Sequence, residues 1–397
     1  MRRVSVRPEN AHQAKLLRLL RDNGPISRAE LGETVQLSRS KLAVELDWLI
    51  ETGLVEALGL APSRGGRRSA IVGLSSELRY LGIDIGATSV DVAVTDGRLN
   101  VLEQVSEPID VRHGPDAVLA VVIDLVGKLR ASGNAVDICG AGVGVPGPVS
   151  FRDGVPVAPP IMPGWNQFPV RTVLSQHLGC PVLVDNDANI MALGEMHAGL
   201  AHTVQDLLFV KVGTGVGCGI IVEGSVYRGA SGSAGDIGHI RVDDDGPVCS
   251  CGNVGCLEAH FSGSALARNG TELARSGRSD VLAERYAEAG EITAADVAAA
   301  ASGGDQQAVE LVRDGGRRLG LLLAGLVSFF NPGMVVIGGE VAAGLGHPFL
   351  AEIRSVVYRR SLPLATGNLP IGLSELGPQA GVIGAARMIS DSVLSHD

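Results

Sequence analysis

The sequence lacks an apolar segment long enough to cross a membrane. Its most apolar stretch, residues 319–330, ends at Asn331-Pro332, whereas a transmembrane helix needs about 18 to 20 consecutive apolar residues. The first residues, MRRVSVRPENAHQ, include basic side chains but no apolar core of the kind found in secretory signals. We therefore expect a cytoplasmic protein.

Cysteine is also scarce, with six residues in a chain of 397. Six cysteines are too few for a disulfide framework at this length, but three of them lie close together, which indicates metal chemistry instead. Charged residues make up 19% of the chain and hydrophobic residues 45%, so disorder is excluded as a description of the whole protein. At roughly 150 residues per domain, the length predicts two or three domains.

Positive charge is concentrated at one end of the sequence. Residues 1–80 contain 13 lysines and arginines against 9 aspartates and glutamates, while the remainder carries 20 against 34. A basic head on an acidic body is the asymmetry expected when only the head contacts a polyanion.

Residues 10–53 carry the signals of three short helices. A leucine-rich pattern over residues 10–21 predicts the first helix. Ser27 and Glu30 have the spacing of a capping box and begin the second helix. A very short turn follows, and Ser38 caps the third helix. Three helices with a tight second connection predict a helix-turn-helix.

Two short strands, residues 54–56 and 71–74, follow these helices and enclose a tip rich in glycine and arginine. This order predicts a winged helix-turn-helix over residues 1–76, with the third helix in the major groove of DNA and the tip against phosphates or the minor groove. The predicted DNA-binding residues are Ser38, Arg39, Ser40, Lys41, Arg64, Arg67 and Arg68. The alternative is a small helical domain with a solvated basic hairpin.

Two glycine-rich turns occur in the body of the chain, which we place at residues 77–397. Residues 81–96 and 209–221 each alternate apolar and polar positions around glycines, so each segment predicts a β-hairpin. Glycine at such a bend lets backbone amides approach a phosphate, and an adjacent aspartate can hold magnesium through water. The ordinary use of glycine in turns also explains each segment.

Between the hairpins, residues 182–189 run from apolar side chains into a polar cluster at the predicted end of a strand. In an open α/β sheet, ligands bind at the carboxyl ends of the strands. Asp187 can act there as a general base on a hydroxyl group, with Asn186 bonding a neighbouring hydroxyl. The alternative is that these residues only cap a helix over residues 190–198.

The most specific local pattern is Gly238-His239 followed by CSCGNVGCLE at residues 249–258. His239, Cys249, Cys251 and Cys256 make a complete tetrahedral ligand set for zinc with no open position. The pattern therefore predicts a structural zinc site rather than a hydrolytic one.

With these motifs, the body resembles the ROK family (repressors, open reading frames and kinases) of the actin-like ATPase superfamily, and the head resembles that of the family's transcriptional regulators. The resemblance covers nearly the whole chain. It implies an α/β fold in which a winged helix-turn-helix precedes a two-lobed actin-like, or ribonuclease H-like, domain. Lobe 1 would span about residues 77–188 plus a carboxyl-terminal helix, and lobe 2 about residues 189–379.

The resemblance also implies roles for individual residues. The sugar-binding residues would be Asn186, Asp187, Asp236, His239 and Glu258. Asp187 would also be the catalytic base if the protein is a kinase. The residues flanking ATP and magnesium would be Asp84, Gly86, Thr88, Gly213, Thr214, Gly215, Gly338 and Gly339.

Three departures from the family's kinase pattern concern these residues. The first hairpin reads Asp84-Ile-Gly-Ala-Thr-Ser89, where the kinases usually have a second glycine and a lysine, so phosphate contact is weakened. Near the adenosine, Gly338-Gly339-Glu340 places bulk and negative charge where the kinases have a third glycine. Asp236 replaces the usual glutamate before Gly-His and is one methylene shorter, so we expect altered sugar contact or selectivity.

These features predict a sugar-responsive transcriptional regulator, with repression of carbohydrate-utilisation genes as the expected outcome. The body would bind a monosaccharide or sugar phosphate between its lobes, and lobe closure would shift the paired winged helices of a homodimer or higher homo-oligomer on a double-stranded DNA operator. Zinc would stiffen the loop that carries His239 and Glu258. The alternatives are an ATP-dependent sugar kinase with a DNA-binding head, and a zinc-stabilised interaction protein with neither activity.

Overall fold

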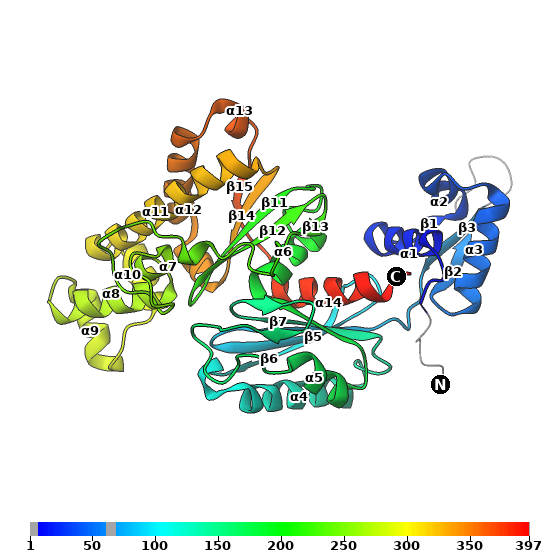
Figure 1. Cartoon of the computed structure of the whole chain (residues 1–397), viewed down its shortest axis with the longest axis horizontal. Helices are drawn as coiled ribbons and strands as arrows, with labels where there is room; N and C mark the ends of the chain where they lie inside the picture. Colours follow the sequence, from blue (N-terminus) through cyan, green and yellow to red (C-terminus); the bar gives the residue numbers. More distant parts are fainter. Residues whose placement is uncertain (1–6, 61–68, 397) are drawn as a thin grey trace.

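The computed structural model describes residues 7–60 and 69–396, and the amino-terminal head forms a small unit at one end of the molecule (Figure 1). Its helices are α1 (Ala11–Asn23), α2 (Arg28–Val35) and α3 (Arg39–Glu51). Its strands are β1 (Ile26–Ser27), β2 (Val55–Leu60) and β3 (Ala70–Leu74), which form a sheet in the order β1-β3-β2. The order matches the predicted winged helix-turn-helix, with β1 as a strand that the sequence did not predict.

Local side-chain bonds fix the ends of the head helices. The Ser27 hydroxyl accepts a hydrogen bond from the Glu30 amide at 3.3 Å, and the Glu30 carboxylate accepts one from the Ser27 amide at 3.3 Å. The predicted capping box is therefore confirmed. The Ser38 hydroxyl accepts from the Lys41 amide at 3.3 Å and begins α3, again as predicted.

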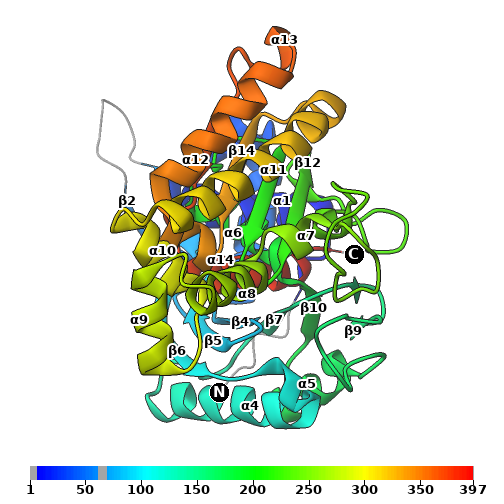
Figure 2. The same cartoon turned by 90° about the vertical axis from the view of Figure 1, so that its left-hand side faces the viewer.

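The first lobe of the body is built on a five-stranded sheet in the order β10-β7-β4-β5-β6. These strands are β4 (Tyr80–Ile85), β5 (Ser89–Thr95), β6 (Val101–Pro108), β7 (Gly140–Val145) and β10 (Val182–Asn186). β4 and β5 pair antiparallel, which confirms the first predicted hairpin. Helices α4 (Pro115–Ala131) and α5 (Val170–Leu178) bury their apolar sides against one face of the sheet, at the bottom of Figure 2.

The second lobe has its own five-stranded sheet in the order β13-β12-β11-β14-β15. Its strands are β11 (Leu207–Val212), β12 (Val216–Val222), β13 (Ser225–Val226), β14 (Met334–Gly338) and β15 (Ile371–Leu373). β11 and β12 pair antiparallel, so the second predicted hairpin is confirmed as well.

A group of helices in the second lobe lies on one side of its sheet. They are α7 (Leu257–His260), α8 (Gly263–Arg275), α9 (Asp280–Ala289), α10 (Ala294–Ser302), α11 (Gln306–Phe330), α12 (Glu340–Arg360) and α13 (Pro363–Thr366). Side chains of α8, α10, α11 and α12 share one buried apolar cluster with β11 and β14. No helix in the described part of the chain combines the length and the apolar character that a membrane crossing requires.

Two helices from distant parts of the sequence lie between the sheets. α6 (Asp187–Ala198) and α14 (Gln379–Val393) pack against each other, and α14 also packs on β4. Their backbones approach so closely that a side chain fits at neither Gly194 nor Gly384: a Cβ atom on Gly384 would lie 1.6 Å from the Ile190 carbonyl oxygen. The pair therefore forms a closely packed link between the two lobes.

The head joins the body at the far end of this helix pair. Leu17 and Leu20 of α1 belong to the same buried apolar cluster as Ile389 and Val393 of α14. Arg21, also on α1, is only 1% exposed. The head therefore packs on the last turns of α14 as part of one continuous core.

Candidate functional site

A cleft opens between the two lobes at the carboxyl ends of their central strands. Its walls come from the segment that follows β7, the junction of β10 and α6, the turn between β11 and β12, and the loop before α7. The residues that line it include Ala87, Pro146, Gly147, Pro148, Ile161, Asn186, Asp187, Lys211, Thr214, Gly215, Gly235, Asp236, His239 and Glu258. All five residues predicted to bind a sugar therefore face one cleft, at the edge of the sheets where ligands bind in α/β folds.

Asn186 and Asp187 stand at the point where β10 ends and α6 begins. The Asn186 side-chain oxygen accepts from the amides of Ala188 at 2.9 Å and Asn189 at 3.3 Å, and its side-chain nitrogen donates to the Gly147 carbonyl at 2.9 Å. Asn186 is thus the helix cap that we considered as the alternative. The helix begins at Asp187, three residues before the predicted start, which places the Asp187 carboxylate in the first turn and in the cleft.

Lys211 is a cleft residue that the sequence analysis missed. Its ammonium nitrogen lies 2.5 Å from Oδ2 of Asp187, and the two side chains are 20% and 10% exposed. Burial alone would lower the pKa of Lys211, but the carboxylates of Asp187 and Asp84 raise it above its usual value. A lone lysine within the apolar strand Phe209-Val-Lys211-Val was the signal that could have identified it.

Asp84 lies behind this ion pair at the end of β4. Its Oδ1 atom is buried without a hydrogen-bond partner among the described residues. Burial raises the pKa of Asp84 to about 7, and the charges of Asp187 and Asp91 add to the rise while Lys211 opposes it. The site therefore holds two carboxyl groups close enough for the charges of Asp84, Asp187 and Lys211 to act on one another.

Glu258 and Asp236 approach the cleft from the loop region of the second lobe. One Glu258 oxygen accepts from the Val216 amide at 3.0 Å. A Cβ atom on Gly215 would lie 2.4 Å from that carboxylate, so the glycine turn is needed to admit Glu258. Oδ1 of Asp236 lies 3.9 Å from Nε2 of His239. The carboxylates and the imidazole present the hydrogen-bonding groups that sugar hydroxyls require.

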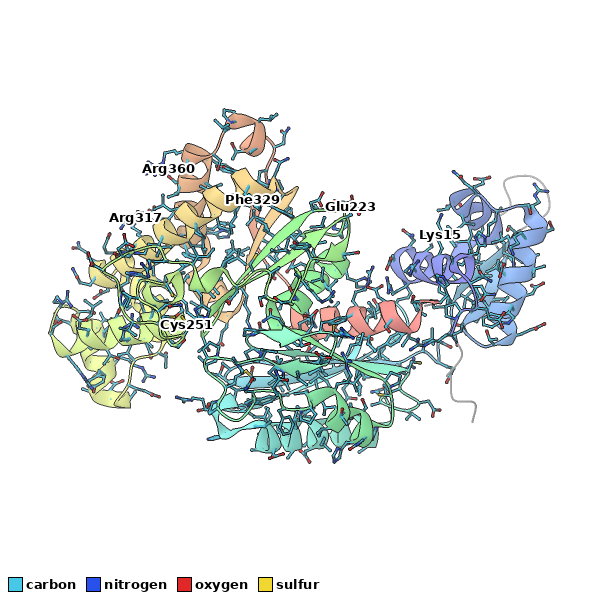
Figure 3. The ribbon with its side chains drawn as sticks, in the orientation of Figure 1. Lys15, Glu223, Cys251, Arg317, Phe329 and Arg360 are labelled. Atoms are coloured by element: carbon cyan, nitrogen blue, oxygen red, sulfur yellow. The ribbon has the colours of Figure 1, made fainter. Side chains whose placement is uncertain are left out.

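The four predicted zinc ligands converge beside the cleft. The ligand atoms of His239, Cys249, Cys251 and Cys256 all lie within 4.8 Å of one another. The Cys249 sulfur is 3.4 Å from Nδ1 of His239, and the sulfurs of Cys251 and Cys256 are 3.8 Å apart. One nitrogen and three sulfur donors suit zinc. Cys251, which is labelled in Figure 3, lies in the loop before α7. Cys256 directly precedes α7, which carries Glu258.

Comparison with known proteins identifies the family. The profile of the ROK family matches residues 80–392. The chain belongs to the ROK family. It is 32% identical over 383 residues to the xylose repressor of Caldicellulosiruptor bescii, covering 96% of this chain and 95% of that protein. It is 34% identical over 318 residues to the glucokinase of Halalkalibacterium halodurans, covering 79% of this chain and 96% of the glucokinase.

A solved structure from the same family shares the fold of this chain. A ROK family transcriptional regulator, described as a homolog of the E. coli MLC protein, matches with a TM-score of 0.81 and 27% identity, covering 96% of both chains. The α/β fold and the ROK membership predicted from the sequence are therefore confirmed.

The predicted nucleotide-binding residues of the ROK domain fall on both lobes. In the second lobe, Thr214 and Gly215 line the cleft just after Gly213. Gly338 pairs with Lys211 across the sheet, and Gly339 caps α12 with a φ of 94°. Gly213, Gly338 and Gly339 therefore lie at the same end of the sheet, where β11 and β14 finish.

Two first-lobe residues of this group, Gly86 and Thr88, form backbone hydrogen bonds within the lobe. The Gly86 amide donates to the Ser89 carbonyl at 2.8 Å and closes the β4–β5 turn on itself. The Thr88 carbonyl accepts from the Ile109 amide at 3.0 Å. Ala87 is the residue of this turn that lines the cleft. The missing glycine of the kinase pattern is therefore the position nearest to the ligand space.

The predicted DNA-contacting residues Ser38, Arg39, Ser40 and Lys41 are all exposed at the amino end of α3. Lys41 is paired with the buried carboxylate of Glu45, with 2.7 Å between Nζ and Oε1. Glu45 also accepts from the side chains of Gln13 at 2.8 Å and Asn10 at 3.1 Å. Glu45 therefore ties α3 to α1. Arg64, Arg67 and Arg68, predicted at the wing tip, lie outside the described residues.

Proposed function

We propose that the protein is a sugar-responsive transcriptional regulator, and specifically a repressor of genes for carbohydrate use. The head would bind an operator in double-stranded DNA, and the ROK domain would bind a monosaccharide or sugar phosphate in the cleft. The likeness to a xylose repressor along 96% of this chain supports the proposal, because the glucokinase match covers only 79%.

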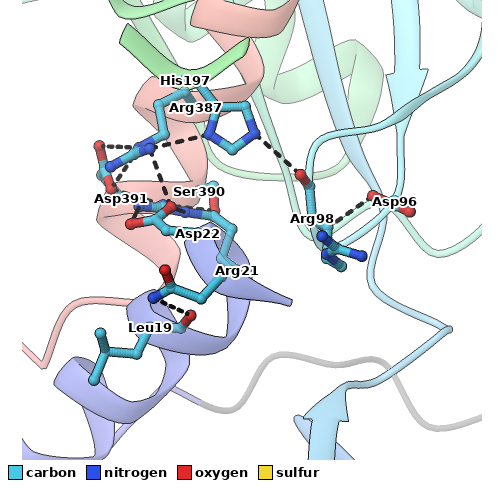
Figure 4. A network of polar contacts seen from close by, with 10 residues as sticks. Leu19, Arg21, Asp22, Asp96, Arg98, His197, Arg387, Ser390 and Asp391 are labelled. Atoms are coloured by element: carbon cyan, nitrogen blue, oxygen red, sulfur yellow. Dashed lines mark hydrogen bonds and ion pairs between the residues drawn. The ribbon is translucent and has the colours of Figure 1, made fainter. Parts of the chain in front are cut away.

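The observation that carries the proposal is a continuous connection from the cleft to the head. α6 begins with Asp187 in the cleft and ends close to His197, at the joint between body and head. Figure 4 shows the contacts there: Arg387 of α14 donates to Nδ1 of His197 at 3.2 Å and to the carboxylate of Asp22 on α1 at 3.1 Å. Nε2 of His197 lies 3.1 Å from the Arg98 carbonyl oxygen.

Arg21 adds a second bond from the head to α14. Its guanidinium donates to the Asp391 carboxylate at 2.7 Å and to the Ser390 hydroxyl at 3.2 Å. Burial acts to raise the pKa of Asp391, but the charges of Arg21 and Arg387 outweigh it and lower the pKa. The carboxylate is therefore ionised and bonded from both the head and the body.

This joint supplies a route by which a sugar can change DNA affinity. Closure of the lobes on a sugar would displace the amino end of α6, and the tight packing of α6 on α14 would carry the displacement to the joint. The sugar alters DNA binding only if it binds one arrangement of the head more tightly than another. The same requirement makes the effect reciprocal: bound operator changes the affinity for sugar by the same factor.

We propose two further components of the regulator. Zinc held by His239 and the three cysteines would fix the loop and helix that present His239 and Glu258 to the sugar. Two or more chains would pair, because one winged helix has a small footprint and a two-fold pair reads an inverted repeat.

Capture of genomic DNA by the zinc-loaded protein tests the proposed function. We expect the protein to retain specific promoter fragments at a stated salt concentration, since phosphate contacts make affinity steeply dependent on salt. Challenge of each complex with sugars and sugar phosphates should reveal one class that changes the retention. A protein that binds no fragment better than bulk DNA, with or without sugars, is not a regulator.

The second candidate function is sugar phosphorylation, favoured by the position of Asp187 in the cleft and by the likeness to a glucokinase. It would require Mg²⁺ and ATP. ATP-dependent consumption of glucose, xylose, mannose or N-acetylglucosamine that Asp187→Asn abolishes would establish the kinase. A protein whose melting temperature no sugar changes would instead be a zinc-stabilised interaction protein.

A further inference from the structure

Lys211 lies in the cleft, and neither of the functions considered for the cleft gives it a role. It is the charged residue of β11, a strand whose other side chains are apolar. Its ammonium group binds Oδ2 of Asp187 at 2.5 Å, while Oδ1 of Asp187 accepts from the Ala188 amide at 2.7 Å. Both oxygens of the candidate catalytic base therefore have hydrogen-bond partners within the protein.

The surroundings of Lys211 hold its ammonium group beside the carboxylates. The Lys211 side chain is 20% exposed, and Asp84 lies near enough that each group shifts the pKa of the other. Asp84 is itself held in place, because a Cβ atom on Gly381 would lie 1.9 Å from its Oδ2 atom. Separating Lys211 from these carboxylates would leave buried charges unpaired, which is costly.

Phosphoryl transfer makes demands that this arrangement does not meet. The transferred phosphoryl group needs a divalent cation to neutralise its oxygens, and the base must be free to take a proton from the attacking hydroxyl. Asp84 and Asp187 are the carboxylates placed to hold such a cation, and carboxylate oxygens are the ligands that magnesium prefers. In this chain the Lys211 ammonium is already bonded to Asp187, and its charge also acts on Asp84.

We propose that Lys211 determines what this site can do: its ammonium group takes the place of a magnesium ion beside Asp84 and Asp187, so that the cleft binds a sugar without nucleotide or divalent cation. Asp187 then serves as a hydrogen-bond acceptor for a sugar hydroxyl rather than as a base. The inference rests on the proposed function, because it explains how a ROK cleft signals the presence of a sugar without consuming it.

Thermal melting with Mg²⁺ as the only added probe tests this role without knowledge of the sugar. In the full-length variant Lys211→Met, the two carboxyl groups lose their cation, and we expect Mg²⁺ to raise the melting temperature of this variant but not of the wild-type protein. The double variant Lys211→Met/Asp84→Asn should lose the Mg²⁺ response. Lys211→Arg retains a cation and should behave like the wild type. Lys211→Gln is a second neutral variant in case Lys211→Met does not fold.

Calorimetric titration with the sugar found in the panel gives the second measurement. The wild-type affinity should be the same with and without Mg²⁺ and an ATP analogue. Lys211→Met should bind the sugar about tenfold more weakly without Mg²⁺ and recover when Mg²⁺ is added, because the binding of cation and sugar is coupled.

Equal stabilisation of the wild type and of the neutral variants by Mg²⁺ would overturn the inference, since a cation would then bind beside Lys211. A wild-type protein that phosphorylates the sugar, with a kcat that Lys211→Met lowers, would overturn it as well and assign Lys211 to the phosphate. A wild-type protein that binds no sugar refutes the proposed function, while the Mg²⁺ response of Lys211→Met still decides the role of the lysine.

Discussion

The two ends of α6 are both polar, but they are built differently. At the cleft end, Asp84 has a buried oxygen without a partner among the described residues, and it lies near the ion pair of Asp187 and Lys211. At the joint, Arg21 and Arg387 each donate to carboxylates of both α1 and α14. A buried carboxylate oxygen without a partner can accept from a ligand, whereas carboxylates that each accept from two arginines hold two parts of a protein in a fixed relation. The comparison indicates that the cleft end of α6 binds a ligand and that the joint end transmits the change to the head.

Removal of Arg21 should break the joint and leave the cleft intact. Arg21→Ala deletes the buried guanidinium that bonds Asp391 and Ser390, and hydrogen bonds to charged groups are worth about 1.5 to 3 kcal/mol. We expect unfolding free energy to fall by about 3 kcal/mol in urea denaturation. Sugar affinity should stay at the wild-type value, while the effect of sugar on DNA retention is lost.

An exposed arginine supplies the matched control. Arg278 pairs with Glu272 at 3.0 Å on the surface, with side chains 52% and 74% exposed. Such pairs contribute roughly 0 to 1 kcal/mol, so Arg278→Ala should leave both stability and sugar response near the wild-type values. If Arg21→Ala keeps the full sugar response, the joint does not carry the signal.

Loss of the metal should have the opposite pattern, with the cleft damaged and the joint intact. Cys251→Ser removes one of the four converging ligands, and the released loop would no longer hold His239 and Glu258 toward the sugar. We expect sugar affinity to fall by about tenfold, or about 1.4 kcal/mol. DNA affinity without sugar should be unchanged. Calorimetry and DNA retention, alongside metal analysis, measure the three quantities.

Cys180→Ser is the control for this variant, because Cys180 is a buried free thiol that lies outside the ligand cluster. It should retain metal and sugar binding. Unchanged sugar affinity in a metal-free Cys251→Ser protein would refute the link between zinc and the sugar site.

Local signals in the sequence predicted the helix caps, hairpins and metal ligands, but they did not predict the contacts between distant segments. The capping box at Ser27 and the two hairpins depend on neighbours within a few residues, and the metal ligands lie within 18 positions of one another. The bond from Arg21 to Asp391 spans 370 positions. An arginine in the last turn of a helix is usually solvated, so the pattern of α1 alone gave no reason to expect its burial.

The start of α6 shows the same limit at shorter range. Asn186 and Asp187 follow an apolar strand, and the sequence left open whether they bind a ligand or cap a helix. The structure shows that Asn186 caps the helix and also lines the cleft. The partner of Asp187 is Lys211, 24 positions away on β11 in the sheet of the second lobe. Only the packing of the two lobes brings these charges together, which is why strand pattern and spacing did not reveal the pair.

A fall in pH should change the contributions of the two ends of α6 to folding stability in opposite directions. Burial, with the charges of Arg387 and Arg21, lowers the pKa of His197 from 6.5 to about 4. The unfolded chain therefore binds a proton that the folded protein does not, and stability falls as the pH drops from 6.5 toward 4. Burial raises the pKa of Asp84 from 3.8 to about 7. Here the folded protein binds the extra proton, and stability rises as the pH drops from 7 toward 3.8.

These opposing contributions partly cancel in the wild-type protein, and single variants should separate them. Between about pH 6 and about pH 5, His197→Gln should gain about 1 kcal/mol of unfolding free energy relative to the wild type, because the destabilising titration is removed. Asp84→Asn should lose about 1 kcal/mol over the same interval, since the stabilising titration is removed. Urea denaturation at several pH values measures each slope, and the double variant should return to the wild-type slope. Two single variants that keep the wild-type slope would show that neither group titrates as its burial requires, and the electrostatic contrast between the two ends of α6 would be wrong.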